Sequence, residues 1–158
     1  MEAERNSLNG SVLDRLLDNE PRNSRESVRD RLFSIGQVKA AVIRDLENLL
    51  NTKGQHISPP ATYKEVNNSL YVYGLRDYTA HNPRSRMVKH HLRQNIEKTI
   101  KQFEPRLKNV MVQFETLNKK EQNLRFRITA MLVIEPVTEP VTFDTYFDVS
   151  RGQYHISQ

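Results

Sequence analysis

The chain has 158 residues, 37% of them hydrophobic and 27% charged, which suits a single domain with a modest core. Its net charge is +5, it contains no cysteine, and no apolar run approaches the ~20 residues of a membrane-spanning helix. These features exclude disulfides, cysteine catalysis and cysteine-held metals, and we expect a cytoplasmic protein with no direct membrane insertion, because the N-terminus has no signal-peptide pattern.

Helices are predicted in the first two-thirds of the chain, after a polar N-terminal arm. Residues 1–33 are polar apart from one short apolar turn, so we expect them to form an arm that docks on another surface. Apolar residues then recur at helical spacing within residues 34–51, 63–73 and 85–103, and Gly74 is expected to stop the second of these helices. The predicted organisation is an arm (1–33) followed by one domain (34–158).

The apolar period changes from helical spacing to strict alternation after Pro105. Alternating residues predict strands within 110–115, 124–134 and 141–149, and a turn at 150–152 leads into a short last strand at 153–156. This order predicts an α+β fold, in which N-terminal helices pack on one face of a C-terminal antiparallel sheet of about four strands.

The sequence offers no recognisable active site. The five glycines are scattered singly, so no phosphate-binding loop is present, and the five histidines have no partners at metal-ligand spacing. A glycosidase needs two carboxylates across a cleft, whereas Glu104 stands in a strongly basic segment with no second acid placed beside it. We therefore expect no enzymatic activity, no cofactor and no metal.

One segment makes the chain basic. Residues 84–108 carry eight Lys and Arg against two Glu, a local charge of +6. No aromatic residue lies between Arg84 and Gln102 to stack on bases, and Arg93, Glu97 and Lys101 can neutralise one another along the helix. The pattern favours a solvated or protein-facing helix face over a nucleic-acid site, and a specific acidic protein surface remains an alternative.

The segment Glu104-Pro105-Arg106 stands out for its physical properties. Pro105 disfavours helix at Glu104, and in an extended chain residues two apart point to the same side. Glu104 and Arg106 would then present opposite charges from a rigid junction, with Arg106 able to bind a partner carboxylate. The alternative is a helix terminator with a solvated ion pair, and Glu20-Pro21-Arg22 shows that the tripeptide alone is common.

Six short segments follow one another along nearly the whole chain: 11–17 (SVLDRLL), 43–52 (IRDLENLLNT), 73–75 (YGL), 103–107 (FEPRL), 124–128 (LRFRI) and 143–145 (FDT). In this order they resemble the TssE family of type VI secretion baseplate subunits. That family is similar to the baseplate wedge protein of contractile-tailed phages and to a bacterial anti-adaptor. Its members often carry the label lysozyme, which we interpret as historical because no carboxylate pair is found.

The resemblance implies a structural role in a cytoplasmic baseplate assembled at the bacterial inner membrane. The implied partners are the wedge proteins TssF and TssG, with TssK as a further candidate, and the sheath proteins TssB and TssC. Glu104, Pro105 and Arg106 would dock on the wedge. The strand containing Gln153, Tyr154, His155 and Ile156 is predicted to be a sheet edge, whose unpaired backbone groups could accept a sheath strand and so template the contractile sheath.

Two other functions remain open at this stage. A regulatory binding protein of the anti-adaptor kind would share the fold, although the N-terminal segment 11–17 resembles the secretion subunits instead. A peptidoglycan-cutting enzyme would need Glu104 as its acid. The structural assembly subunit is the preferred prediction.

Overall fold

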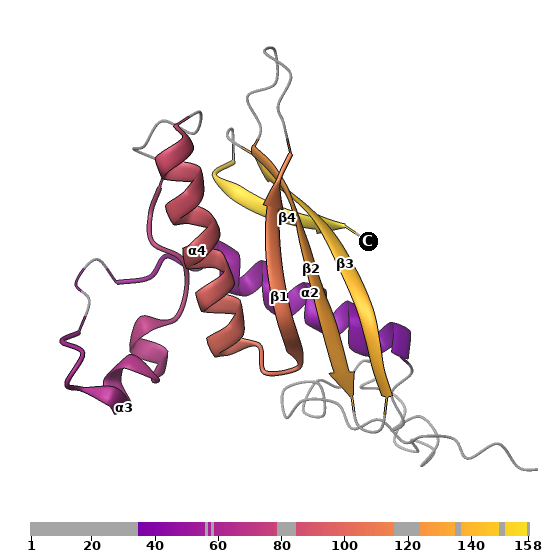
Figure 1. Ribbon diagram of the computed structural model, residues 1–158, viewed down its shortest axis with the longest axis horizontal. Helices are drawn as coiled ribbons and strands as arrows, with labels where there is room; N and C mark the ends of the chain where they lie inside the picture. The colour runs from indigo at the N-terminus through magenta and orange to yellow at the C-terminus, as the bar shows by residue number, and fades with distance from the viewer. Residues whose placement is uncertain are drawn as a thin grey trace, which may run out of the picture.

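The computed structural model describes residues 35–55, 57, 59–78, 85–115, 124–134, 137–148 and 151–157. The predicted arm, residues 1–33, lies outside the described residues and stays a prediction. The described elements are, in chain order, α2 (Ile35–Asn51), α3 (Lys64–Asn67), the 3-10 helix η1 (Leu70–Val72), α4 (Arg86–Phe103), β1 (Leu107–Phe114), β2 (Leu124–Ile134), β3 (Val137–Asp148) and β4 (Gln153–Ser157). This is the predicted α+β order, with the helices before the sheet (Figure 1).

The two long helices bury the apolar stripes that predicted them. Val42 and Leu46 of α2 and Ile96 and Ile100 of α4 are fully buried, because residues three and four apart share one helix face. In Figure 1, α2 crosses behind the sheet while α4 runs beside β1. No helix in the described part of the chain is long and apolar enough to cross a membrane.

The segment predicted as one helix over residues 63–73 is instead broken into α3 and η1, so this prediction was wrong. Ser69 interrupts the helix: its hydroxyl accepts the backbone N–H of Tyr71 at 3.2 Å and donates to the carbonyl of Val66 at 2.8 Å. Such local side-chain bonds compete with the helical pattern. The segment stands away from the sheet in Figure 1.

Gly74 ends this segment, as the sequence predicted. Its φ is +100°, and a Cβ at this position would lie 2.4 Å from the carbonyl oxygen of Thr52, so only glycine fits the close approach to the end of α2. Two backbone hydrogen bonds, between Gly54 and Leu75 (2.7 Å) and between Leu75 and Thr52 (2.9 Å), hold the chain there.

The sheet is a four-stranded antiparallel meander in the order β1-β2-β3-β4. Strand β2 spans the predicted range, whereas β1 and β3 begin three and four residues earlier than predicted, at Leu107 and Val137. In β1 the reason is an irregularity between Lys108 and Met111, where Asn109 has a φ of 53° and breaks the alternation.

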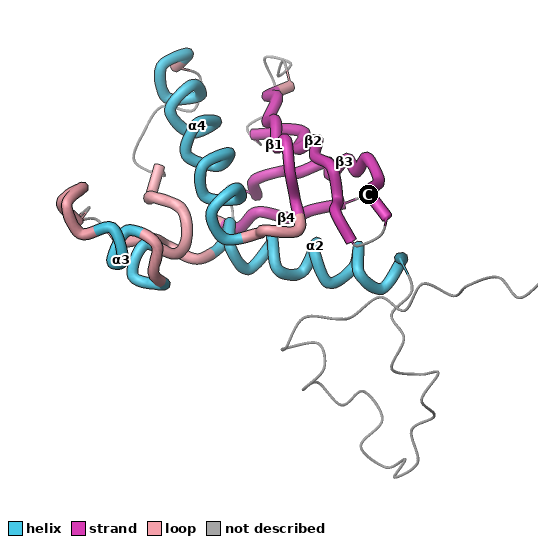
Figure 2. Tube along the Cα trace, turned by 60° about the horizontal axis from the view of Figure 1, so that its bottom comes forward, coloured by secondary structure: helices cyan, strands magenta, loops and turns pink. Residues whose placement is uncertain are grey.

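The core lies between the helices and one face of the sheet. Phe126, Ile128 and Leu132 of β2 and Phe143 of β3 are at most 1% exposed and pack against the helices, while alternate residues such as Arg127 and Asp144 face the other side and are exposed. The predicted packing of helices on one face of the sheet is therefore confirmed. In the turned view of Figure 2, α2 lies alongside β4 at the border of this sheet.

Candidate docking site at the α4–β1 junction

The predicted docking residues lie in a tight connection between α4 and β1. Helix α4 ends at Phe103, and the N–H of Glu104 still bonds the carbonyl of Ile100 at 2.8 Å. The N–H of Leu107, the first residue of β1, bonds the carbonyl of Glu104 at 3.1 Å. Because both flanking elements pack in the core, the position of the three residues between them is fixed.

Arg106 binds two carboxylates of its own chain. Its Nε donates to Glu104 Oε1 and its Nη2 to Glu104 Oε2, both at 2.6 Å, which is the bidentate geometry typical of arginine and carboxylate. The same Nη2 donates to Asp45 Oδ2 of α2 at 2.6 Å. Arg44 holds the other oxygen, Asp45 Oδ1, at 2.9 Å. The four side chains form a row of alternating charge with a net charge of zero.

This geometry corrects the predicted fork. Glu104 was expected to point outward beside Arg106, but it is only 4% exposed and faces the protein. The guanidinium of Arg106 binds Glu104 through two hydrogen bonds and Asp45 of α2 through a third, so the two carboxylates share it. What remains on the surface is the exposed ring of Pro105 and about a quarter of the Arg106 side chain.

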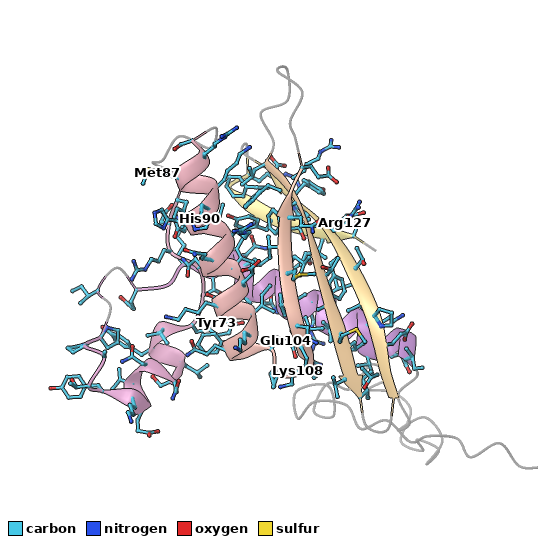
Figure 3. The ribbon with its side chains drawn as sticks, viewed as in Figure 1. Tyr73, Met87, His90, Glu104, Lys108 and Arg127 are labelled. Carbon is cyan, nitrogen blue, oxygen red and sulfur yellow. The ribbon has the colours of Figure 1, made fainter. Side chains whose placement is uncertain are left out.

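The charges of this cluster also act on a neighbouring tyrosine. Figure 3 shows Tyr73 and Glu104 at the same end of α4, and the Tyr73 ring meets the Phe103 ring edge-on at 5.1 Å. Burial raises the pKa of the Tyr73 phenol, and the negative charges of Asp45 and Glu104 raise it further. The hydrogen bond with Glu104 is the main cause that raises the pKa of Arg106, against the opposing effect of burial.

Sequence reasoning missed Asp45 and Arg44 as members of the cluster. Asp45 lies 61 residues before Arg106, and both residues are on a helix of which only the apolar stripe was interpreted. The available signal was an acidic residue next to the buried face of α2, since such a charge needs a partner.

The predicted edge strand is an edge, but three of its outward backbone groups are bonded by side chains of α2. Strand β4 pairs only with β3 among the described strands. The Tyr154 N–H donates to Asn51 Oδ1 at 2.7 Å, and the Tyr154 carbonyl accepts from Asn51 Nδ2 at 2.9 Å. The Ile156 N–H donates to Glu47 Oε1 at 2.8 Å. The premise that this edge is unpaired was therefore wrong, because α2 covers it.

The basic segment differs from its predicted ladder of charges. Glu97 accepts the backbone N–H of Val112 in β1 at 2.9 Å, and among the described residues it forms no ion pair with Arg93 or Lys101. Lys98 and Lys101 are exposed on α4, while Arg93 is half-buried, with Nη2 3.2 Å from His90 Nδ1. The outer face of α4 keeps its positive charge.

Glu104 is only 4% exposed, and the second carboxylate near it, Asp45, binds the same guanidinium. Within the part of the chain that the structure describes, no group of three or more His, Cys, Asp or Glu side chains could hold a metal ion.

Comparison with known proteins gives one family. No curated protein sequence matches the chain. Among solved structures, a chain of "The baseplate complex from the type VI secretion system" is similar at 18% identity, covering 70% of this chain and 94% of that one, with a TM-score of 0.48, which is too low to carry an argument. The family model "Baseplate wedge protein gp25" matches residues 36–137, more than half of the sequence. The chain therefore belongs to the gp25 family of baseplate wedge proteins.

Proposed function

We propose that this chain is a non-enzymatic structural subunit of a type VI secretion baseplate in the bacterial cytoplasm, at the inner membrane. The observation that carries the proposal is the match to the baseplate wedge family over residues 36–137. The proposed partners are the wedge proteins TssF and TssG, with TssK as a further candidate, and the sheath proteins TssB and TssC. The predicted N-terminal arm would provide an additional contact.

We place the wedge contact at Glu104, Pro105 and Arg106. The Nε and Nη2 hydrogens of Arg106 are engaged, which leaves the two Nη1 hydrogens without an acceptor among the described residues. Pro105 is exposed beside them on a backbone fixed by α4 and β1. A partner carboxylate could therefore bind Nη1 while Glu104 and Asp45 hold the guanidinium in place, so Glu104 acts by positioning Arg106.

Co-purification with TssF and TssG tests this contact, provided that loss of docking is separated from loss of folding. The double variant Glu104→Met/Arg106→Met removes both charges of the pair and leaves Asp45 with Arg44, so no carboxylate is stranded. We expect this variant to keep the circular dichroism spectrum of the wild type but to be lost from the co-purified complex.

Arg127→Met is the matched control. Arg127 Nε also donates to a carboxylate oxygen at 2.6 Å, that of Asp144, but on the exposed face of the sheet. This variant should co-purify normally. If the folded double variant co-purifies as well as the control does, the contact at residues 104–106 is wrong and their cluster serves only the fold.

The second proposed contact is strand pairing at β4, Gln153 to Ile156, which would template the sheath. Its support is the edge position of β4 in the sheet. Because Asn51 and Glu47 of α2 bond backbone groups on part of that edge, an incoming strand would have to replace these hydrogen bonds.

A further inference from the structure

The first half of helix α4 carries a row of cations on the side that faces β1. Arg93 lies one turn before Glu97, whose carboxylate accepts the Val112 N–H of β1 at 2.9 Å, so Arg93 lies on the same side of the helix. Lys89 lies one turn before Arg93, and Arg86 lies about two turns before it. We call Arg86, Lys89 and Arg93 the cationic row.

No carboxylate in the described part of the chain pairs with the cationic row. Glu97, the one acidic residue of α4, bonds the backbone of β1 instead. Glu115, at the end of β1, lies 3.6 Å from Arg127 of β2. The positive charge of the row is therefore left uncompensated by the residues that the structure describes.

Arg93 is the member of the row whose hydrogen bonds are incomplete. Its side chain is half-buried, and its Nε is shielded from solvent with no acceptor among the described residues. Its Nη2 lies 3.2 Å from Nδ1 of His90, a contact that supplies no negative charge. A buried donor without an acceptor costs free energy, and a carboxylate is the acceptor that suits a guanidinium best.

An acidic protein segment fits this surface better than a nucleic acid does. Met87 lies next to Arg86 and is 72% exposed, and methionine and arginine are both enriched in protein interfaces. No Phe, Tyr or Trp lies on α4 before Phe103 to stack on a base. The three cations of the row are also few beside the roughly 6–10 phosphate contacts of strong nucleic-acid binding.

We propose that the cationic row is a docking surface for an acidic segment of a partner protein, one carboxylate of which accepts from Arg93 Nε. Arg86 and Arg93 are about 10.5 Å apart along the helix axis, a distance that about three residues of an extended segment cover. Figure 3 shows Met87 and His90 towards one end of α4 and Glu104 at the other. This surface is therefore separate from the proposed wedge contact at residues 104–106 and does not depend on it.

Fluorescence anisotropy of a fluorescein-labelled hexaglutamate peptide, titrated with the full chain at low salt, measures this binding. Arg93→Gln should weaken binding about tenfold, because a hydrogen bond between charged groups contributes on the order of one decade in affinity. Lys98→Gln is the matched control, since it removes the same charge from an exposed residue about 140° further around the same helix. The control should weaken binding less than about twofold. Glu104→Met/Arg106→Met should bind the peptide as the wild type does.

Thermal unfolding separates a docking role of Arg93 from a structural one. Because Arg93 pairs with no carboxylate among the described residues, Arg93→Gln should unfold at the wild-type temperature or above it. A residue that serves the fold would instead lower the unfolding temperature when it is replaced.

Equal weakening by Arg93→Gln and Lys98→Gln would overturn the proposal, because net charge alone would then attract the peptide. Absence of peptide binding would overturn it, as would a lower unfolding temperature of Arg93→Gln with unchanged binding. Tighter binding of a labelled thymidine hexanucleotide than of the peptide would also overturn it, because the partner would then be a nucleic acid. These measurements use the isolated protein, so their failure is distinct from failure of co-purification with TssF and TssG.

Discussion

Two of the long-range polar contacts of helix α2 differ in what they stabilise. In its middle, Asp45 binds Arg106, which holds Glu104, a carboxylate that is only 4% exposed. At its end, Asn51 and Glu47 bind backbone groups of β4 at the rim of the sheet. The first contact compensates buried charge, whereas the second replaces hydrogen bonds that water or another strand could make.

Because the two contacts stabilise different groups, a substitution at Arg106 and one at Asn51 should change different properties of the protein. Loss of Arg106 leaves the buried Glu104 without its counter-ion, so the free energy of unfolding should fall. Loss of Asn51 exposes backbone groups that solvent can bind, so the fold should survive. The α4–β1 junction is therefore part of what holds the domain together, whereas at the β4 edge α2 side chains bond backbone groups that lie at the border of the sheet.

The largest effect is expected at Arg106. Arg106→Met should lower the free energy of unfolding by about 3 kcal/mol, because it leaves a nearly buried carboxylate unpaired. Arg127→Met removes an ion pair of the same 2.6 Å length on the exposed face and should change stability little. Urea unfolding followed by circular dichroism measures the free energy of unfolding of both variants. If both lose the same amount, burial of Glu104 does not determine the stability that its ion pair contributes.

A smaller effect is expected in alkaline solution, where each region contains a tyrosine with a raised pKa. Burial, followed by the negative charge of Asp77, raises the pKa of Tyr154 to about 12. At the junction, burial and the charges of Asp45 and Glu104 raise the pKa of Tyr73. Between pH 10 and 12 the unfolded chain loses the Tyr154 proton that the folded chain keeps, so stability is full below pH 10 and falls as the pH rises.

The expected slope from Tyr154 is about 1.4 kcal/mol per pH unit in that window. Urea unfolding at a series of alkaline pH values should show this decline, and Tyr154→Phe should remove the part that Tyr154 contributes. An unchanged slope in Tyr154→Phe would mean that the Tyr154 hydroxyl does not carry the effect.

Most of the fold could be predicted from the sequence because its signals are local. The apolar stripes of α2 and α4 and the alternation in β2 each repeat within one element. Pro105 disfavours helix at the residue before it, so it predicts the end of α4 at Phe103. Segment 63–73 was mispredicted because the hydroxyl of Ser69 bonds backbone groups that a continuous helix would use. The start of β1 was missed because the positive φ of Asn109 interrupts the alternation.

The candidate sites depend on pairs that no local pattern encodes. Asp45 meets Arg106 across 61 residues, and Asn51 and Glu47 meet β4 across 103 and 109 residues. Without these partners, Glu104-Pro105-Arg106 suggested an outward fork and β4 suggested a free edge. The structure places the first motif between α4 and β1 and the second at a sheet edge, as expected, but the residues that surround each differ from the expectation.

Glu104 and Arg106 stabilise the domain as one ion pair whose carboxylate is buried. A double-mutant cycle measured by urea unfolding tests this claim most directly. Arg106→Met alone should cost about 3 kcal/mol, whereas Glu104→Met/Arg106→Met should lie within about 1 kcal/mol of the wild type, because replacing both members of a buried pair leaves no charge unpaired. If the double variant instead loses as much stability as the two single variants combined, the two residues act independently and the account of the junction is contradicted.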